Sequence, residues 1–247
     1  LSTIERGTLF ERLYTEPNNF NKIFLPWHAD PRRDQAWYRQ TKTDLGDLIM
    51  QEYPATVEEA LTIPGGAYFP EFKRDSHIIP GQPDPENVRY VSIDYGLDMF
   101  AALFYEVDAK GKPIVYKQIH EPNLVVYGAA KKLLEAQGSD RIAEYFAPPD
   151  LWARNRDTGK STAEIFGEYG VYLSRASAPR EQGCLNIKEY LRLRDEVNEQ
   201  TGTTKKTPLL QIYEGAAPDL VRCLSKIQKD PKRPNEYANE PHDLTHI

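Results

Sequence analysis

The stretch Tyr90-Val91-Ser92-Ile93-Asp94-Tyr95-Gly96 decides the predicted fold, because it places an acid inside a strand. The alternation puts one set of side chains, Val91, Ile93 and Tyr95, on one face and Ser92 and Asp94 on the other. Carboxylates are disfavoured in strands, and burying one is costly unless it is paired or binds a metal. Gly96 would let a backbone or a substrate come close. Asp94 is therefore either a functional acid or an acid that caps the turn after the strand.

The sequence around this strand predicts an α/β fold. Three strands come first, followed by a helix and then by strands that alternate with helices. This order gives a ribonuclease H-like mixed β-sheet flanked by helices on both faces. The expected strands are 88–95, 100–107, 113–120, 142–146, 171–174 and 209–213, and the expected helices are 124–137, 161–169, 183–199 and 218–228, with a flexible polar turn through Thr207 before the last strand.

The first 62 residues differ from the rest, because prolines interrupt short polar and aromatic stretches. Residues 56–61 predict one short helix, capped by Thr56 with Glu59 at the capping-box position. A linker rich in proline and glycine follows over residues 64–85. We therefore expect two parts, residues 1–66 and residues 67–247. The chain begins with Leu1 and has no signal sequence, and we expect it to be a fragment of a longer protein.

Composition limits the classes of function. The 247 residues are 40% hydrophobic, enough for one sizeable core, and no apolar run is long enough to span a membrane. The net charge of −6 argues weakly against nucleic-acid binding, although an acidic site can still be rimmed by a local basic patch. Cys184 and Cys223 lack metal-ligand spacing, and we expect them to be buried apolar residues in a reducing cytosol.

Asp150 strengthens the functional interpretation of Asp94. In the predicted topology, the strand at 142–146 lies parallel to and beside the Asp94 strand, so Asp150 would project near Asp94. Converging carboxylates are suitable ligands for two Mg²⁺ or Mn²⁺ ions, which activate water and stabilise the leaving oxygen in phosphodiester cleavage. The alternative for Asp150 is a helix cap or an Asx turn after Pro149.

A third ligand is expected near the C-terminus, where His242, Asp243 and His246 cluster. We predict Asp243 as a catalytic metal ligand and His246 as a further metal ligand. The alternatives are a mononuclear metal site built from the two histidines and the acid, or a disordered, solvated tail.

Residues 158–161 resemble the end of a phosphate-binding P-loop, but Arg154 stands where the motif needs a glycine. We therefore expect no ATP site here. Arg154, Arg156 and Lys160 would instead contact a DNA backbone, or form a solvated loop. Arg175, Arg180 and Lys188 could extend this patch.

These motifs resemble a known family. Residues 52–56 (Glu-Tyr-Pro-Ala-Thr) and 147–152 (Ala-Pro-Pro-Asp-Leu-Trp) are similar to segments of bacteriophage terminase large subunits, the first where the ATPase and nuclease halves join and the second at an acidic motif of the nuclease half. Residues 24–38 resemble the end of the motor half, and residues 92–96 resemble the first nuclease strand. Ala176-Ser177 with Arg180 and Gly183 is also typical of the family.

The resemblance implies a metal-dependent endonuclease that cuts concatemeric double-stranded viral DNA, with Asp94 and Asp150 as metal ligands. Residues 1–66 would be the tail of the ATPase half and the linker. It further implies the ATPase half, the small terminase subunit and the portal protein as partners, in the host cell cytoplasm. At the C-terminus the chain differs from the family's pattern. His246-Ile247 resembles the beginning of the family's last acidic motif, so the aspartate of that motif would follow Ile247.

Two other functions fit parts of the sequence. A resolvase or transposase-type nuclease would share Asp94 and Asp150, but it would leave residues 52–56 unexplained. A non-catalytic module that docks to the packaging motor would need neither aspartate.

Overall fold

The structure is a computed structural model that describes residues 9–46, 49–60, 67–96, 98–176, 180–197, 202–230 and 236–238. The described residues form two compact units. Unit 1 contains residues 9–68 and 226–238, and unit 2 contains residues 69–225. No pattern in the sequence indicates that residues 226–238 join the N-terminal part. The domain boundary predicted after residue 66 stays a prediction.

Unit 1 is built from short helices and aromatic contacts. The Trp27 ring stacks on Tyr38 with centroids 4.5 Å apart, and the Trp27 amide donates to the carbonyl of Pro54. The Tyr68 amide donates to the carbonyl of Ile227, which joins this part of the chain to a segment near the C-terminus. The helices of unit 1 are α1 (Leu9–Thr15), η1 (Trp27–Ala29), α2 (Gln35–Leu45), α3 (Ile49–Glu52) and α4 (Val57–Ala60).

The cap predicted for the helix at residues 56–61 is confirmed in α4, with one difference. The Thr56 hydroxyl accepts from the Glu59 amide at 3.2 Å, as expected of an N-cap. The Glu59 carboxylate accepts from the Ala55 amide at 2.6 Å, one residue earlier than in a standard capping box.

Unit 2 contains a seven-stranded mixed sheet in the order β1-β9-β4-β3-β2-β5-β6. The three strands predicted to come first, β2, β3 and β4, form an antiparallel meander, and β5 and β6 continue parallel to β2. The strands are β1 (Ile78–Ile79), β2 (Val88–Tyr95), β3 (Phe100–Val107), β4 (Pro113–Glu121), β5 (Ile142–Ala147), β6 (Leu173–Arg175) and β9 (Gln211–Tyr213).

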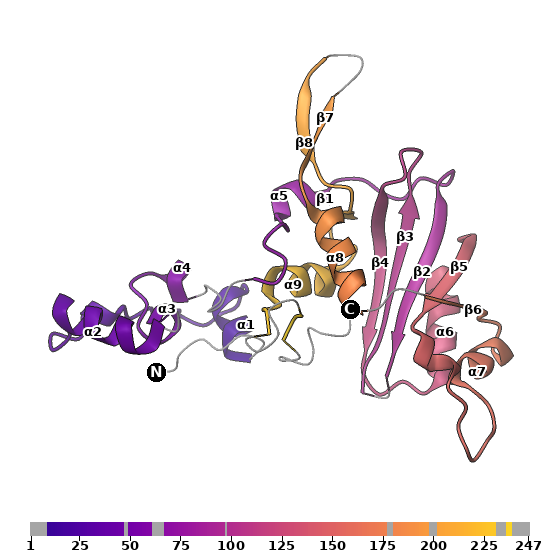
Figure 1. Cartoon of the computed structure of the whole chain (residues 1–247), viewed down its shortest axis with the longest axis horizontal. Helices are drawn as coiled ribbons and strands as arrows, with labels where there is room; N and C mark the ends of the chain where they lie inside the picture. The colour runs from indigo at the N-terminus through magenta and orange to yellow at the C-terminus, as the bar shows by residue number, and fades with distance from the viewer. Residues whose placement is uncertain are drawn as a thin grey trace. The chain divides into compact units, whose positions relative to one another are not determined.

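Helices cover the sheet of unit 2, as predicted. Figure 1 shows α6 and α7 beside β5 and β6, with α8 and α9 toward the β4 side. Gln118 of β4 accepts from the first amides of α9, which fixes that helix on the face opposite α6 and α7. The helices are α5 (Arg74–His77), α6 (Val126–Gln137), η3 (Pro149–Trp152), α7 (Thr162–Glu168), α8 (Arg180–Leu191) and α9 (Pro218–Lys226). Within the described ranges, no helix is long and apolar enough to cross a membrane.

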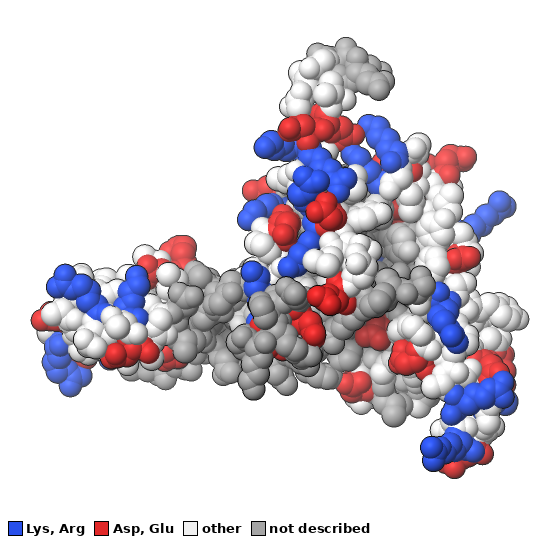
Figure 2. Space-filling model, viewed as in Figure 1, with Lys and Arg blue, Asp and Glu red and all other residues white. Residues whose placement is uncertain are grey.

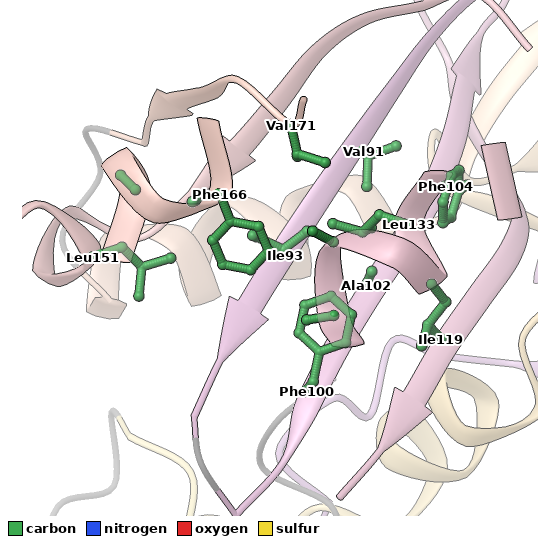
Figure 3. Close-up of a cluster of buried hydrophobic side chains, with 14 of the residues drawn as sticks. Val91, Ile93, Phe100, Ala102, Phe104, Ile119, Leu133, Leu151, Phe166 and Val171 are labelled. Carbon is green, nitrogen blue, oxygen red and sulfur yellow. The ribbon is translucent and has the colours of Figure 1, made fainter. Parts of the chain in front are cut away.

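The core of unit 2 lies between the sheet and helices α6 and α7. Ile93 of β2, Leu133 of α6 and Phe166 of α7 meet there, and each is at most 5% exposed. Leu151 of η3 points into the same cluster beside Phe166 (Figure 3). The alternation predicted for residues 88–95 is therefore confirmed, since Val91, Ile93 and Tyr95 face this core.

The helix predicted over residues 183–199 is wrong in its second half, as is the flexible turn after it. Helix α8 ends at Leu191, and β7 (Arg194–Val197) pairs antiparallel with β8 (Thr204–Thr207). Glu196 binds Lys110 and Lys112 of the β3–β4 turn, distant residues that no local pattern reveals. Thr204 and Thr207 are β-branched and favour a strand.

The predicted linker at residues 64–85 also contains regular structure where it is described. Ile78 and Ile79 form β1, which pairs with β9, and His77 of α5 is fully buried. The His77 Nε2 lies 2.8 Å from the carbonyl of Leu191, so this segment is anchored to the end of α8.

Candidate functional site

Asp94 lies at the carboxyl end of β2, on the face that points away from the α6–α7 core. Its neighbours Ile93 and Tyr95 face that core, which fixes the orientation of Asp94 through strand alternation. The Asp94 side chain is exposed. The predicted strand and face of Asp94 are confirmed, and its exposure means that the cost of burying a charge does not apply to it.

Asp150 follows the neighbouring strand β5. Strands β2 and β5 run parallel, with Ser92 opposite Phe146, so both strands end at the same end of the sheet. Asp150 lies in η3 between Pro149 and Leu151, and the burial of Leu151 in the core fixes this turn. Asp150 is exposed. The structure therefore brings Asp94 and Asp150 to the carboxyl ends of adjacent parallel strands, and we call this place the acidic strand ends.

Gly96 accommodates a side chain of the same chain at this place. A Cβ atom at Gly96 would lie 2.6 Å from Asp98 Oδ1 and 3.3 Å from the carbonyl oxygen of Met99, so a larger residue here would have to displace the exposed Asp98 side chain. The Gly96 amide also donates to the carbonyl of Met99, which closes the turn into β3. Asp98 is not among the residues predicted for the site, although it is an acid close after Asp94 and before the next strand.

Asp243 and His246 lie outside the described residues. Among the residues that are described, no three His, Cys, Asp or Glu side chains are grouped so that they could hold a metal ion. Asp94 and Asp150 are exposed carboxylates, the donor type that hard divalent cations take. The described part of the site therefore fits Mg²⁺ or Mn²⁺ in donor chemistry and supplies an incomplete set of ligands.

The basic loop after η3 is tied to helix α7. Arg154 lies 3.0 Å from Glu164, and Lys160 lies 2.5 Å from Glu168. The hydrogen bond from Lys160 to Glu168 raises the pKa of Lys160. Arg156 is exposed within the loop and forms no ion pair with a described residue. The Arg180 side chain lies outside the described residues.

A capping box at the start of α7 holds this loop in place. The Ser161 hydroxyl accepts from the Glu164 amide, and the Glu164 carboxylate accepts from the Ser161 amide. Hydrogen bonding from the Ser161 amide is the main cause of the lowered pKa of Glu164. Among the described residues on the face drawn in Figure 2, acidic and basic side chains are intermixed.

A polar cluster that no sequence pattern indicates shares the Asp94 face. Asp94 of β2 lies opposite Ala101 of β3, and Ala101 lies opposite His120 of β4, so Asp94 and His120 are on the same face of the sheet. His120 Nδ1 lies 3.6 Å from the Asp219 carboxylate at the start of α9, and Gln118 Nε2 donates to the same carboxylate at 2.5 Å. His120 Nε2 is buried and has no hydrogen-bond partner among the described residues.

Comparisons with known proteins rest on structure, since no protein-family model and no curated sequence matches the chain. The large terminase of a thermophilic bacteriophage is similar with a TM-score of 0.54 at 13% identity, over 89% of this chain and 53% of that chain. The nuclease domain of the P22 large terminase is similar with a TM-score of 0.54 at 10% identity, over 72% of this chain and 87% of that domain. The chain has the fold of a terminase nuclease domain.

The terminase nuclease fold agrees with the ribonuclease H-like fold predicted from the sequence. The thermophilic phage protein is similar over a larger share of this chain than the P22 nuclease domain is, and the chain spans about half the length of that large terminase. A structure of the same phage protein in complex with ADP is similar with a TM-score of 0.55 at 13% identity, over 90% of this chain and 53% of that chain.

Proposed function

We propose that unit 2 is a divalent-metal-dependent DNA endonuclease of a viral packaging terminase, which cuts concatemeric double-stranded DNA. The observation that carries the proposal is the placement of Asp94 and Asp150 at the carboxyl ends of adjacent parallel strands, within the fold of a terminase nuclease domain. We propose Asp94, Asp150 and Asp243 as catalytic metal ligands and His246 as a fourth ligand.

Two Mg²⁺ or Mn²⁺ ions would supply the hydrolytic chemistry by activating water and stabilising the leaving oxygen. The protein's own contribution is to hold two carboxylates on rigid elements. Asp94 is fixed by the pairing of β2 with β3, and Asp150 is fixed by Leu151, which is 4% exposed. Arg154, Arg156, Lys160 and Arg180 would contact the phosphate backbone and set the position of the duplex, since phosphate contacts carry no sequence information.

The same proposal covers partners and location. The ATPase half of the same polypeptide, the small terminase subunit and the portal protein are the proposed partners, in the host cell cytoplasm. The similarity to the thermophilic phage large terminase covers 89% of this chain, against 72% for the P22 nuclease domain, and this larger share supports the first of these partners.

The test is cleavage of plasmid and linear duplex DNA in Mg²⁺ or Mn²⁺. Asp94→Asn and Asp150→Asn should each abolish cleavage while circular dichroism stays unchanged. Glu144→Gln is the matched control, because Glu144 is an exposed acid on β5, the strand that leads into η3, and lies before the strand end. It should cut like the parent protein.

Each contrary result of the cleavage test would indicate a different correction to the proposal. Full cleavage by Asp94→Asn would rule out its role as a ligand. Cleavage of a four-way junction in preference to linear duplex would indicate a resolvase-type enzyme. A folded parent protein that cuts no DNA in either metal would indicate a docking module.

A further inference from the structure

Arg175 ends the third parallel strand beside the acidic strand ends. In the register of β5 and β6, Phe146 lies opposite Ser174 and Ala147 lies opposite Arg175. Since β2, β5 and β6 run parallel, their carboxyl ends lie at the same end of the sheet in the order Asp94, Asp150, Arg175. Two acids are thus followed by one base along this row.

The Arg175 guanidinium is held by an aromatic ring. Its Cζ lies 5.0 Å from the centroid of the Trp152 ring. Trp152 is partly buried against the core and ends η3, the turn that carries Asp150. A cation–π contact positions the guanidinium without neutralising its charge, so its N–H donors stay available for an anion.

Two of the other cations near this end of the sheet are paired with acids. Arg154 and Lys160 are matched by Glu164 and Glu168 of α7. Arg156 forms no ion pair with a described residue, and no described ring stacks on it. Arg175 is exposed, likewise forms no ion pair with a described residue, and lies on the strand next to β5, beside the acidic strand ends.

We propose that Arg175, stacked on Trp152, binds a backbone phosphate of the DNA substrate beside the acidic strand ends. The inference rests on the proposed nuclease function. A guanidinium suits this role because its planar fork matches two phosphate oxygens, and because the polyanionic duplex must approach two carboxylates. Arg175 is then a binding residue, and Trp152 is a positioning residue that acts through it.

The test measures binding of a short duplex to the whole chain by fluorescence anisotropy in Ca²⁺ over a range of salt concentrations. Arg175→Gln should weaken binding about tenfold, the effect of losing one charge-assisted hydrogen bond. It should also make the slope of log K against log salt shallower by about 0.9, the value for one phosphate contact. Trp152→Leu keeps the charge, so it should weaken binding while the salt slope stays unchanged.

Arg141→Gln is the matched control. Arg141 is exposed and precedes Ile142, at the opposite end of β5, so this substitution removes the same charge far from the acidic strand ends. It should leave both affinity and slope as in the parent protein. Equal effects of Arg175→Gln and Arg141→Gln, in a parent protein that binds and cuts DNA, would overturn the role of Arg175 and leave the nuclease intact. A parent protein that neither binds nor cuts DNA would overturn both proposals.

Discussion

The contact that holds the β7–β8 hairpin to the β3–β4 turn yields a quantitative prediction. The Glu196 carboxylate accepts from Lys110 Nζ at 2.8 Å, from Lys112 Nζ at 2.6 Å and from the Thr207 hydroxyl at 2.7 Å. The hydrogen bond from Lys110, followed by those from Lys112 and Thr207, lowers the pKa of Glu196 from its ordinary value of 4.5 to about 2. The stabilisation is therefore full above pH 4.5 and is lost as the pH falls toward about 2.

The size of the effect follows from solvent exposure. Without solvent screening, this change in the pKa of Glu196 would correspond to about 3 kcal/mol of stabilisation. The side chains of Glu196 and Lys110 are 30% and 70% exposed, however, so water and salt screen the attraction. Exposed ion pairs contribute about 0.2–1 kcal/mol each. With Lys112 only 14% exposed, we expect Glu196→Gln to lower the free energy of hairpin opening by about 1–2 kcal/mol.

Amide hydrogen exchange across β7 and β8 measures this opening. Glu196→Gln should exchange about 5–30-fold faster than the parent protein at neutral pH. The control is Asp195→Asn, an exposed acid on the same strand that forms no ion pair with a described residue. Equal exchange in the two variants would refute the contact. The contact would also be refuted if the β7–β8 amides of the parent protein were equally protected from exchange at about pH 6 and at about pH 2.5, after correction for intrinsic exchange rates.

The packing of unit 2 and the proposed metal chemistry lead to three further expectations. Gln118→Ala leaves the first amides of α9 without their acceptor, so urea denaturation should show unit 2 destabilised by about 1–2 kcal/mol. Phe166→Ala empties a fully buried position and should cost about 3–5 kcal/mol in the same measurement, whereas a cost below about 1 kcal/mol would contradict its place in the core. Mn²⁺ at about 100 times its Kd should stabilise the protein by about 2.7 kcal/mol. EDTA should reverse the accompanying rise in Tm, and Asp94→Asn should abolish it.

The sequence predicts the sheet where the pattern is local. Residues 88–95 alternate because one face of β2 packs on the core, and the parallel placement of β5 follows from the helix before it. The β7–β8 hairpin could not be predicted in this way. Glu196 is stabilised by Lys110 and Lys112, which are close in space and far apart in sequence. Strand β1 depends in the same way on its pairing with β9.

The position of the candidate site could be predicted from the sequence, whereas the exposure and the contacts of its side chains could not. The strand and the face of Asp94 follow from alternation, but its exposure does not, because exposure depends on what covers that face. The stacking of Arg175 on Trp152 depends on how β6 is placed beside η3, and no spacing along the chain encodes this. Asp243 and His246 stay predictions.

The composition of unit 1 from two distant stretches has a consequence for synthesis. Tyr68 is fully buried, and its amide donates to Ile227, which leaves the ribosome only after the whole of unit 2. At about 5–20 residues per second, this delay lasts about ten to thirty seconds. Unit 2 can fold within that time, while the Tyr68 side chain stays exposed because residues 226–238 have not yet been made. The segment around Tyr68 is thus exposed to aggregation until Ile227 has been made, and a chaperone that binds this segment during synthesis would raise the yield of folded protein.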